Sequence, residues 1–378
     1  MSKKRKGSYI DLSRQRESNC RYNLVWGERS NGKTYGILDK GLVDYAEKGD
    51  ELALIRRWAE DFVGENSAKT AFNTLECNGE GVNRIAEIFH DEYDCVVYAK
   101  GDYYLGKRDP DTGKPQLSGK IVAHAFVLNT PERYKGGSWP KIKTVLFDEF
   151  IADRGRYIVG EFRNFTNILS SIIRQRDDVV IWRAGHTQRM SRFNPYFDEM
   201  GLHRAKDLQK GQLEVYEYGD SGLRVSTFYS DNPAGKKASD VYFAFDNPAL
   251  KMIKSGEWEL DIYPHAPKGL KWKPKHVSFS FFIDFDGSIY QADCISISGS
   301  QFIYIHDKTT PIKDPDHDLI FSREWDPRPN WRRSLVARPV LPVEKKIAMF
   351  FAMQKVFYQD NSVGDSVASY LQWCRTSA

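Results

Sequence analysis

The sequence contains few cysteines and no long hydrophobic run. Its five cysteines are odd in number and form no C-x-x-C pair, which indicates a reducing compartment and gives no zinc pattern. No apolar run reaches the ~18 residues of a membrane-spanning helix, so we expect no membrane association. The N-terminal segment MSKKRKGSY has no apolar stretch behind its charges, so no secretory signal is expected there. A net charge of only +4 says little about binding partners.

The composition is that of a folded protein. With 378 residues, of which 41% are hydrophobic and 28% charged, the chain is neither wholly disordered nor a coiled coil, and it is long enough for about two or three domains. Segments typical of strands and helices alternate in the first 206 residues, which predicts a mostly parallel α/β sheet. Further along, aromatic strand-like runs over 279–285 and 289–297 flank Asp286-Gly287 and predict a hairpin.

The strongest chemical signal is the segment 27–34, Gly-Glu-Arg-Ser-Asn-Gly-Lys-Thr, which matches the P-loop pattern G-x-x-x-x-G-K-S/T. A short apolar run precedes it and a helical pattern over 33–46 follows, so an ordinary glycine loop with a surface lysine is the weaker interpretation. In a P-loop, backbone N–H groups cradle phosphate oxygens at the start of a helix. Lys33 is expected to neutralise the β- and γ-phosphates, and the Thr34 hydroxyl to hold Mg²⁺. The predicted ATP-binding residues are Gly27, Arg29, Ser30, Asn31, Gly32, Lys33, Thr34, Tyr35 and Arg56.

A second signal is the segment 145–149, Val-Leu-Phe-Asp-Glu, a buried-type strand that ends in two acids. Asp148 is expected to hold Mg²⁺ and Glu149 to polarise the attacking water. Such an adjacent glutamate is typical of ATPases with an extra central strand, and no N-K-x-D motif for guanine occurs. Alone, the segment could be a strand entering a surface turn; together with the P-loop it favours ATP hydrolysis.

Several basic or polar residues are candidates for contacting the γ-phosphate. Arg174 and Arg176 lie at a predicted helix end, at what we expect to be a sheet edge within reach of a neighbouring subunit. The alternative for them is a solvated helix end with local Arg–Asp pairs. Arg56 and Arg57 follow the second strand and are further candidates for sensing phosphate, although ordinary surface charge is the favoured interpretation for them. After the strand over 179–182, His186 and Thr187 are further candidates, although a lone histidine is more often structural.

With these motifs and the segment Phe-Asn-Pro-Tyr-Phe over 193–197, residues 20–200 resemble the DNA-packaging ATPases of small short-tailed bacteriophages, which are similar to large terminase subunits. The resemblance implies a P-loop NTPase domain of the ASCE type, a linker domain and an RNase H-like C-terminal domain. It implies a homo-oligomeric ring, typically a pentamer, docked on the portal of a procapsid in the host cell cytoplasm. It also implies ATP and Mg²⁺ as cofactors, double-stranded DNA as substrate, a structural packaging RNA as partner in some members, and an arginine finger acting in trans.

These expectations divide the chain into three parts. Residues 1–206 are predicted to form the P-loop ATPase domain, 207–240 a linker subdomain and 241–378 an RNase H-like α+β domain. A working nuclease needs several carboxylates around two metals. Asp284 lies within a predicted strand, but Asp286 is better interpreted as a turn residue, and Asp314, Asp316 and Asp318 as solvated charge in a loop. We therefore expect a vestigial nuclease that binds DNA, RNA or the procapsid.

Nucleic-acid contacts are predicted at two basic segments. The first is the Gly-, Asp- and Pro-rich loop over 101–120, and the second surrounds Trp272; solvated charge is the alternative for both. The predicted contact residues are Lys107, Arg108, Lys114, Lys120, Lys271 and Lys273, with Lys268 and Lys275 nearby, while Lys3, Lys4, Arg5 and Lys6 are interpreted as a basic tail.

Three function classes follow from these features. The leading one is a motor subunit that couples ATP hydrolysis to the translocation of double-stranded DNA. The alternative is a large terminase subunit with an active metal-dependent C-terminal nuclease. A non-viral helicase or a P-loop kinase is weaker, because a kinase would need an acceptor-binding lid and no base of the Glu149 type.

Overall fold

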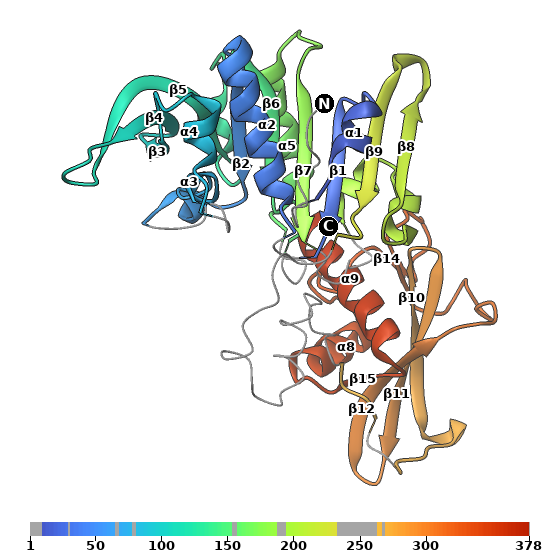
Figure 1. Ribbon diagram of the computed structural model, residues 1–378. Coiled ribbons are helices and arrows are strands. Elements are labelled where there is room, and N and C mark those ends of the chain that lie inside the picture. The colour runs from blue at the N-terminus through green and yellow to red at the C-terminus, as the bar shows by residue number, and fades with distance from the viewer. Residues whose placement is uncertain are drawn as a thin grey trace. The chain divides into compact units, whose positions relative to one another are not determined.

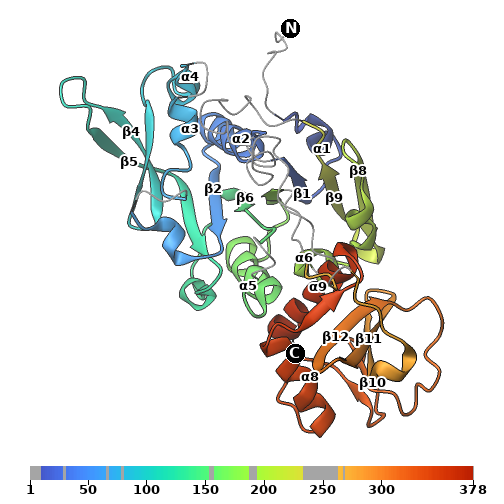
Figure 2. The same ribbon diagram turned by 90° about the horizontal axis from the view of Figure 1, so that it is seen from below.

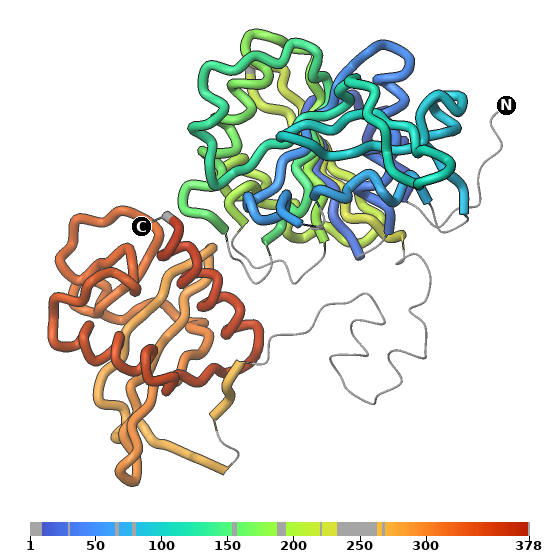
Figure 3. Tube along the Cα trace, turned by 90° about the vertical axis from the view of Figure 1, so that its left-hand side faces the viewer, coloured from blue at the N-terminus to red at the C-terminus, as the bar shows by residue number. Residues whose placement is uncertain are grey.

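The computed structural model describes residues 10–28, 31–64, 68–77, 81–152, 157–186, 194–232, 263–266 and 269–377 (Figure 1). The chain divides into two compact units. The first comprises residues 1–152, 161–188 and 195–258, and the second comprises 259–378 with the short segments 153–160 and 189–194. Figure 3 shows the first in blue to yellow and the second in orange to red. In the described parts of the chain, no helix has both the length and the apolar character needed to cross a membrane.

The first unit is built on a nine-stranded sheet with the order β3-β4-β5-β2-β6-β7-β1-β9-β8. The six strands from β5 to β9 in this order run parallel. Antiparallel pairs add β4 and then β3 at one edge and β8 at the other. The strands are β1 (Tyr22–Gly27), β2 (Glu51–Arg56), β3 (Cys95–Ala99), β4 (Asp102–Arg108), β5 (Pro115–Val127), β6 (Ile142–Asp148), β7 (Val180–His186), β8 (Leu213–Tyr218) and β9 (Leu223–Tyr229).

The position of β7 defines the subclass of this sheet. β7 pairs with β1, which leads into the P-loop, and with β6, which ends at Asp148. One strand therefore separates the strand that carries the phosphate-binding loop from the strand that carries the acids. This is the arrangement of P-loop NTPases with an additional central strand, so the predicted α/β fold is confirmed.

Helices cover both faces of this sheet. The main ones, α2 (Lys33–Lys48) and α5 (Glu161–Ile173), lie on opposite faces (Figure 2). The short helices are α1 (Ser13–Glu17), α3 (Asn73–Glu76), α4 (Arg84–Ile88) and α6 (Pro195–Glu199). Because both faces are covered, the central strands are mostly buried and rich in apolar residues; five of the six residues of β2 are buried.

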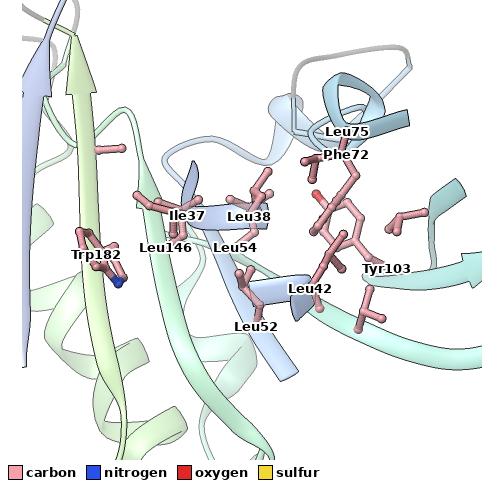
Figure 4. Close-up of a cluster of buried hydrophobic side chains, with 14 of the residues drawn as sticks. Ile37, Leu38, Leu42, Leu52, Leu54, Phe72, Leu75, Tyr103, Leu146 and Trp182 are labelled. Atoms are coloured by element: carbon pink, nitrogen blue, oxygen red, sulfur yellow. The ribbon is translucent and has the colours of Figure 1, made fainter. Parts of the chain in front are cut away.

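The core under α2 holds this helix on the sheet. Ile37, Leu38 and Leu42 are spaced for one helical face and pack against Leu54 and Leu146 of the strands (Figure 4). α2 ends where predicted, at Gly49, whose left-handed φ of 76° lets its N–H donate to the Tyr45 carbonyl.

The predicted linker subdomain over 207–240 is wrong in its first half. β9 pairs in parallel with β1, and β8 pairs with β9, so residues 213–229 extend the sheet of the ATPase domain. Residues 233–240 lie outside the described part of the chain. The sequence missed this because an edge hairpin after a long α/β segment has the same local pattern as a small separate domain.

The second unit contains a six-stranded mixed sheet with the order β14-β13-β10-β11-β12-β15. Its strands are β10 (Val277–Phe285), β11 (Ser288–Ile297), β12 (Ser300–Asp307), β13 (Ile320–Ser322), β14 (Trp331–Arg332) and β15 (Val356–Tyr358). The hairpin between β10 and β11 is the predicted one: Asp286 and Gly287 have φ of 54° and 74°, as a tight hairpin turn requires.

Two helices, α8 (Pro342–Ala352) and α9 (Asn361–Ser377), lie together on one side of this sheet (Figures 1 and 2). Alternate residues of β10 form the buried layer beneath them, and the Phe285 ring meets the Tyr370 ring of α9 with centroids 5.6 Å apart. The unit is thus an α+β domain. Its assignment as RNase H-like stays a prediction.

Candidate nucleotide-binding site

The phosphate-binding loop lies between β1 and α2, at the carboxyl end of the parallel strands. β1 ends at Gly27 and α2 begins at Lys33. A side chain has no room at Gly27, because a Cβ atom there would lie 2.9 Å from the Cβ of Ser230. Gly32 precedes α2 with a φ of 85°, a conformation that glycine adopts at little cost. Both glycines of the motif are therefore required by the shape of the loop.

The Lys33 side chain is buried within this loop. Its Nζ donates to the Gly27 carbonyl at 3.2 Å, the Glu28 carbonyl at 2.8 Å and the Asn31 Oδ1 at 2.8 Å. Burial lowers the pKa of Lys33 to about 7, and the carboxylates of Asp148 and Glu28 oppose this shift. An anionic triphosphate would stabilise the charged form of this lysine.

Thr34 and Asp148 lie in contact although they are far apart in the chain. The Thr34 hydroxyl donates to the Asp148 Oδ1 at 2.7 Å, and Asp148 is the last residue of β6. The Asp148 Oδ2 accepts from the Arg56 Nη1 at 2.8 Å. Hydroxyl and carboxylate oxygens are ligands that Mg²⁺ prefers. The two residues predicted to hold the metal are therefore placed where they fit one magnesium ion.

Glu149 follows β6 and has a left-handed backbone, with a φ of 60°. Its Oε2 accepts from the Arg56 Nη2 at 3.0 Å, and its Oε1 lies 3.8 Å from the His186 Nε2. Burial raises the pKa of Glu149, which the positive charge of Arg56 opposes. The side chain is still 46% exposed. A carboxylate that is accessible and has a raised pKa suits a general base.

Arg56 and Arg57 are both buried, so their interpretation as ordinary surface charge is wrong. Arg56 joins the acids of the site, since its Nε also lies 3.4 Å from the Asp61 Oδ2. Arg57 instead forms a buried ion pair with Glu161, with its Nε 2.8 Å from the Glu161 Oε2. Arg56 is therefore placed among the acids that would face a nucleotide, and the position of Arg57 does not support phosphate sensing.

The expected sheet-edge position of Arg174 and Arg176 is wrong. Both follow α5 and precede β7, which lies inside the sheet. They lie at the amino end of the parallel strands, whereas Asp148 lies at the carboxyl end of β6. The length of β6, at about 3.3 Å per residue, puts about 20 Å between these two ends. They cannot reach the P-loop of their own chain from there.

The two arginines also differ in their contacts. Arg176 donates to five backbone carbonyls, those of Trp139, Pro140, Ile142, Ile172 and Ile173, at 2.6 to 3.2 Å. These contacts occupy its guanidinium and indicate a structural role. Arg174 is exposed and donates to the carbonyls of Gly136 and Gly137, so its role as a finger stays a prediction.

The predicted DNA-contacting loop is the hairpin of β4 and β5, and most of its cations are paired with acids. The Lys107 Nζ lies 3.7 Å from the Asp94 Oδ2, the Lys120 Nζ lies 3.4 Å from the Glu92 Oε1, and Arg108 pairs with Glu76. For Lys114, no ion pair is seen among the described residues. This hairpin is therefore less positive than its sequence suggests.

The second predicted basic segment lies against the sheet of the C-terminal unit. The Trp272 ring packs on the Tyr304 ring with centroids 4.8 Å apart, and the flanking Lys271 and Lys273 are exposed. Where side chains are described, neither lysine forms an ion pair. Their predicted role in nucleic-acid binding stays a prediction.

The C-terminal acids do not form a recognisable cluster. The Asp284 Oδ2 lies 3.5 Å from the Ser322 Oγ, and burial raises the pKa of Asp284. Asp314 and Asp316 lie in the loop after β12 and form ion pairs with His317 of the same loop and with Arg328, which follows β13. Within the residues that the structure describes, no group of three or more His, Cys, Asp or Glu side chains is arranged to hold a metal ion.

Some predicted residues cannot be placed. Those outside the described residues are Lys3, Lys4, Arg5, Lys6, Arg29, Ser30, Thr187 and Lys268. Tyr35 is partly buried and packs against the core under α2. The sequence missed Asp61 and Glu161, because an acid after a strand or at a helix start is a common feature without a motif. Tyr196 lies in the segment 193–197 that carries the resemblance, but no role was predicted for it.

The fold and the site together define a P-loop NTPase with an additional central strand. Residues 112–225 match the family model described as Podovirus DNA encapsidation protein (Gp16). The chain is 25% identical over 270 residues to the DNA packaging protein of Bacillus phage B103, an alignment that covers 70% of this chain and 71% of that protein. It is 24% identical over 197 residues to the DNA packaging protein of Bacillus phage phi29, which covers 52% of this chain and 50% of that protein.

Two solved structures share the fold over nearly the whole chain. The Phi-28 gp11 DNA packaging motor matches with a TM-score of 0.53 and 17% identity and covers 98% of this chain and 99% of that one. The bacteriophage Phi-29 viral genome packaging motor assembly matches with a TM-score of 0.50 and 15% identity, over 96% and 98%. The predicted resemblance to the DNA-packaging ATPases of short-tailed phages is thus confirmed.

Proposed function

We propose that this chain is the ATPase subunit of a motor that drives double-stranded DNA into a phage procapsid. The observation that carries the proposal is the contact of Thr34 with Asp148, made across the additional strand and beside Glu149. The similarity to DNA packaging proteins of Bacillus phages supports the substrate. The site supports hydrolysis, because it combines a phosphate loop, a metal-binding pair and a base.

Each side chain of the site has a defined task in this proposal. The loop amides and Lys33 bind the phosphates of ATP. Thr34 and Asp148 would hold Mg²⁺, which neutralises charge on the β- and γ-phosphates when bound. Glu149 accepts the proton of the attacking water, and Arg56 donates to both neighbouring carboxylates and offsets the repulsion between their charges.

The partners of the motor are part of the proposal. A subunit whose arginine acts in trans works in a homo-oligomeric ring, which we propose to be a pentamer docked on the portal of the procapsid in the host cell cytoplasm. The C-terminal unit offers Lys271 and Lys273 beside Trp272 for contacts with DNA or with a structural packaging RNA.

The alternative, an active C-terminal nuclease, is less well supported. Asp284 has one neighbouring carboxylate, that of Glu324, and a serine, Ser322, at hydrogen-bonding distance, but in the described part of the chain no third acid joins them to hold a metal. We therefore propose that the C-terminal unit binds without cutting.

The test is to measure ATP hydrolysis by the full-length protein with and without double-stranded DNA, together with its native mass. The proposal expects hydrolysis that DNA stimulates, a ring-sized mass, and intact DNA after incubation with Mn²⁺. Cleavage of the DNA in Mn²⁺ that is lost in the Asp284→Asn variant would instead favour the alternative, a large terminase subunit with an active nuclease. Absence of hydrolysis at every protein concentration, with and without DNA and procapsids, would overturn the proposal.

A further inference from the structure

We propose that Arg57 is a positioning residue for hydrolysis, which sets the direction of the Glu149 carboxylate through the backbone of Glu149. This inference rests on the proposed function, since it concerns the residue that acts as the base. Arg57 contacts the backbone carbonyls of Glu149 and Phe150. It acts on the chain that carries the base.

Two consecutive arginines hold Glu149 in different ways. Arg56 donates to its carboxylate, at 3.0 Å from the Oε2. Arg57 donates from Nη1 to the Glu149 carbonyl at 3.0 Å, and from Nη2 to the Phe150 carbonyl at 3.1 Å. The Phe150 N–H in turn donates to the Ala184 carbonyl of β7 at 3.1 Å. The peptide units on the carboxyl side of Glu149 are thereby held from both sides.

Glu149 needs such support because its φ of 60° is left-handed. A non-glycine residue in this region is strained and keeps the conformation only when surrounding contacts impose it. The chain turns here so that the Glu149 side chain leaves the line of β6 and projects beside Asp148. If the backbone relaxed to a right-handed or extended conformation, the carboxylate would point elsewhere. The donors on Arg57 supply the contacts that oppose this relaxation.

Arg57 is itself held in one orientation by a buried acid. The Glu161 carboxylate, which is fully buried, accepts from the Arg57 Nε and Nη2, both at 2.8 Å. Its Oε1 also accepts from the Tyr196 hydroxyl at 2.7 Å. The guanidinium therefore has two sides with distinct tasks: one side is fixed by Glu161, and the other reaches the two carbonyls. Only the planar fork of arginine can meet these acceptors together; a lysine ammonium cannot.

The support comes from three separate elements. Arg57 directly follows β2, Glu161 is the first residue of α5, and Tyr196 lies in α6. The ring of Tyr196 is in turn covered by the buried guanidinium of Arg183 on β7, 4.7 Å from the ring centroid. The orientation of the base thus depends on how α5 and α6 pack on the sheet, and not only on the strand that carries it.

The test compares two variants of the full-length protein, Arg57→Lys and Tyr196→Phe. For Arg57→Lys we expect kcat to fall by about 10- to 100-fold, as for other small misplacements of a catalytic group, with KM and ADP affinity within about twofold of wild type. For Tyr196→Phe, which removes a single hydroxyl, we expect a fall of about 3- to 10-fold, the value of one hydrogen bond. Arg332→Lys is the matched control, because it alters a half-buried Arg–Glu pair with Glu344 in the other unit; it should leave kcat unchanged.

A double-mutant cycle separates positioning from general stability. If Arg57 acts through Glu149, then Arg57→Lys should cost almost nothing in a Glu149→Gln background, where the base is already lost. Equal losses in both backgrounds, or a raised KM with wild-type kcat, would overturn the proposal. If Arg57→Lys does not fold, Tyr196→Phe becomes the test of the proposal. A wild-type kcat in Tyr196→Phe would then overturn the proposal. A wild-type protein that hydrolyses no ATP would count against the proposed function and not against this contact network.

Discussion

The Thr34 hydroxyl donates a 2.7 Å hydrogen bond to the Asp148 carboxylate and so joins the first turn of α2 to the end of β6. β7 lies between the strands that lead to these two residues, so this hydrogen bond joins the phosphate loop to the acids across the additional strand. The consequences of this arrangement can be tested residue by residue.

Lys33→Ala should abolish ATP binding, because the loop amides alone do not neutralise a triphosphate. In the wild type we also expect a specific pH dependence. The pKa of Lys33 is about 7 in the free protein and rises when the phosphates bind, so binding takes up a proton above this pH. The affinity should be flat below about pH 7 and fall by up to about tenfold per pH unit above it. Titration with a fluorescent ATP analogue across this range measures both effects; a flat profile would contradict the buried-cation interpretation.

Glu149→Gln should bind ATP as the wild type does and hydrolyse it very slowly. The amide keeps the shape of the side chain but cannot accept the proton of the attacking water, so we expect a loss on the order of 10²-fold or more in kcat. Single-turnover hydrolysis of bound ATP measures this directly. Glu92→Gln, a change of the same chemistry on the hairpin side of the unit, is the control and should be active. Hydrolysis within a few-fold of wild type in Glu149→Gln would mean that another group is the base.

Arg56→Gln should move the acid side of the ATPase pH profile to higher pH. Burial raises the pKa of Glu149 and the charge of Arg56 opposes it, so removal of that charge raises the pKa further. The base is active only when deprotonated, and activity must then be lost at a higher pH as the solution is acidified. Arg56→Lys keeps the charge and serves as the control. The rate of hydrolysis at saturating ATP, measured from about pH 5 to pH 8, tests the shift, and an unmoved acid limb would show that Arg56 does not control the base.

How much of this site could be predicted depends on the range of the interactions involved. The loop at Gly27 and Gly32, the helix that ends at Gly49 and the strand that ends at Asp148 follow from local patterns: steric limits on φ, helical spacing and a run of apolar residues. The pairing of β9 with β1 joins segments about 200 residues apart, and the local sequence of neither strand specifies which strand it pairs with. Glu161 was missed for the same reason, since a glutamate in the first turn of a helix is ordinary until the structure places Arg57 against it.

Contacts with DNA should involve phosphates and so depend steeply on salt and little on sequence. Because Lys107 and Lys120 are paired with acids, we expect their replacement by glutamine to change the salt dependence less than replacement of Lys271 and Lys273. Binding of a labelled duplex at several salt concentrations gives the slope for each double variant. A larger change from the Lys107 and Lys120 pair would instead identify the hairpin as the main DNA contact.

Arg174 and Arg176 should separate into a finger candidate and a structural residue. Arg176→Ala leaves five carbonyls without their donor, so we expect a loss of about 2 kcal/mol or more in the free energy of unfolding, measured with urea. Arg174→Ala should change stability by less than about 0.5 kcal/mol, as is usual for exposed residues. If Arg174 acts in trans, the same variant loses on the order of 10³-fold in kcat while it still binds ATP.

Mixing experiments decide whether Arg174 serves a neighbouring subunit. A Lys33→Ala subunit lacks a working phosphate loop but can donate Arg174, and an Arg174→Ala subunit keeps its loop. Some activity should therefore return when the two are mixed, at interfaces where an intact loop meets an intact arginine. Arg163→Ala, a change in the exposed part of α5, is the control partner and should hydrolyse ATP without help. If native mass measurements show mixed rings and no ratio restores hydrolysis, Arg174 is not the finger, and the finger must be sought among other residues of the ring interface.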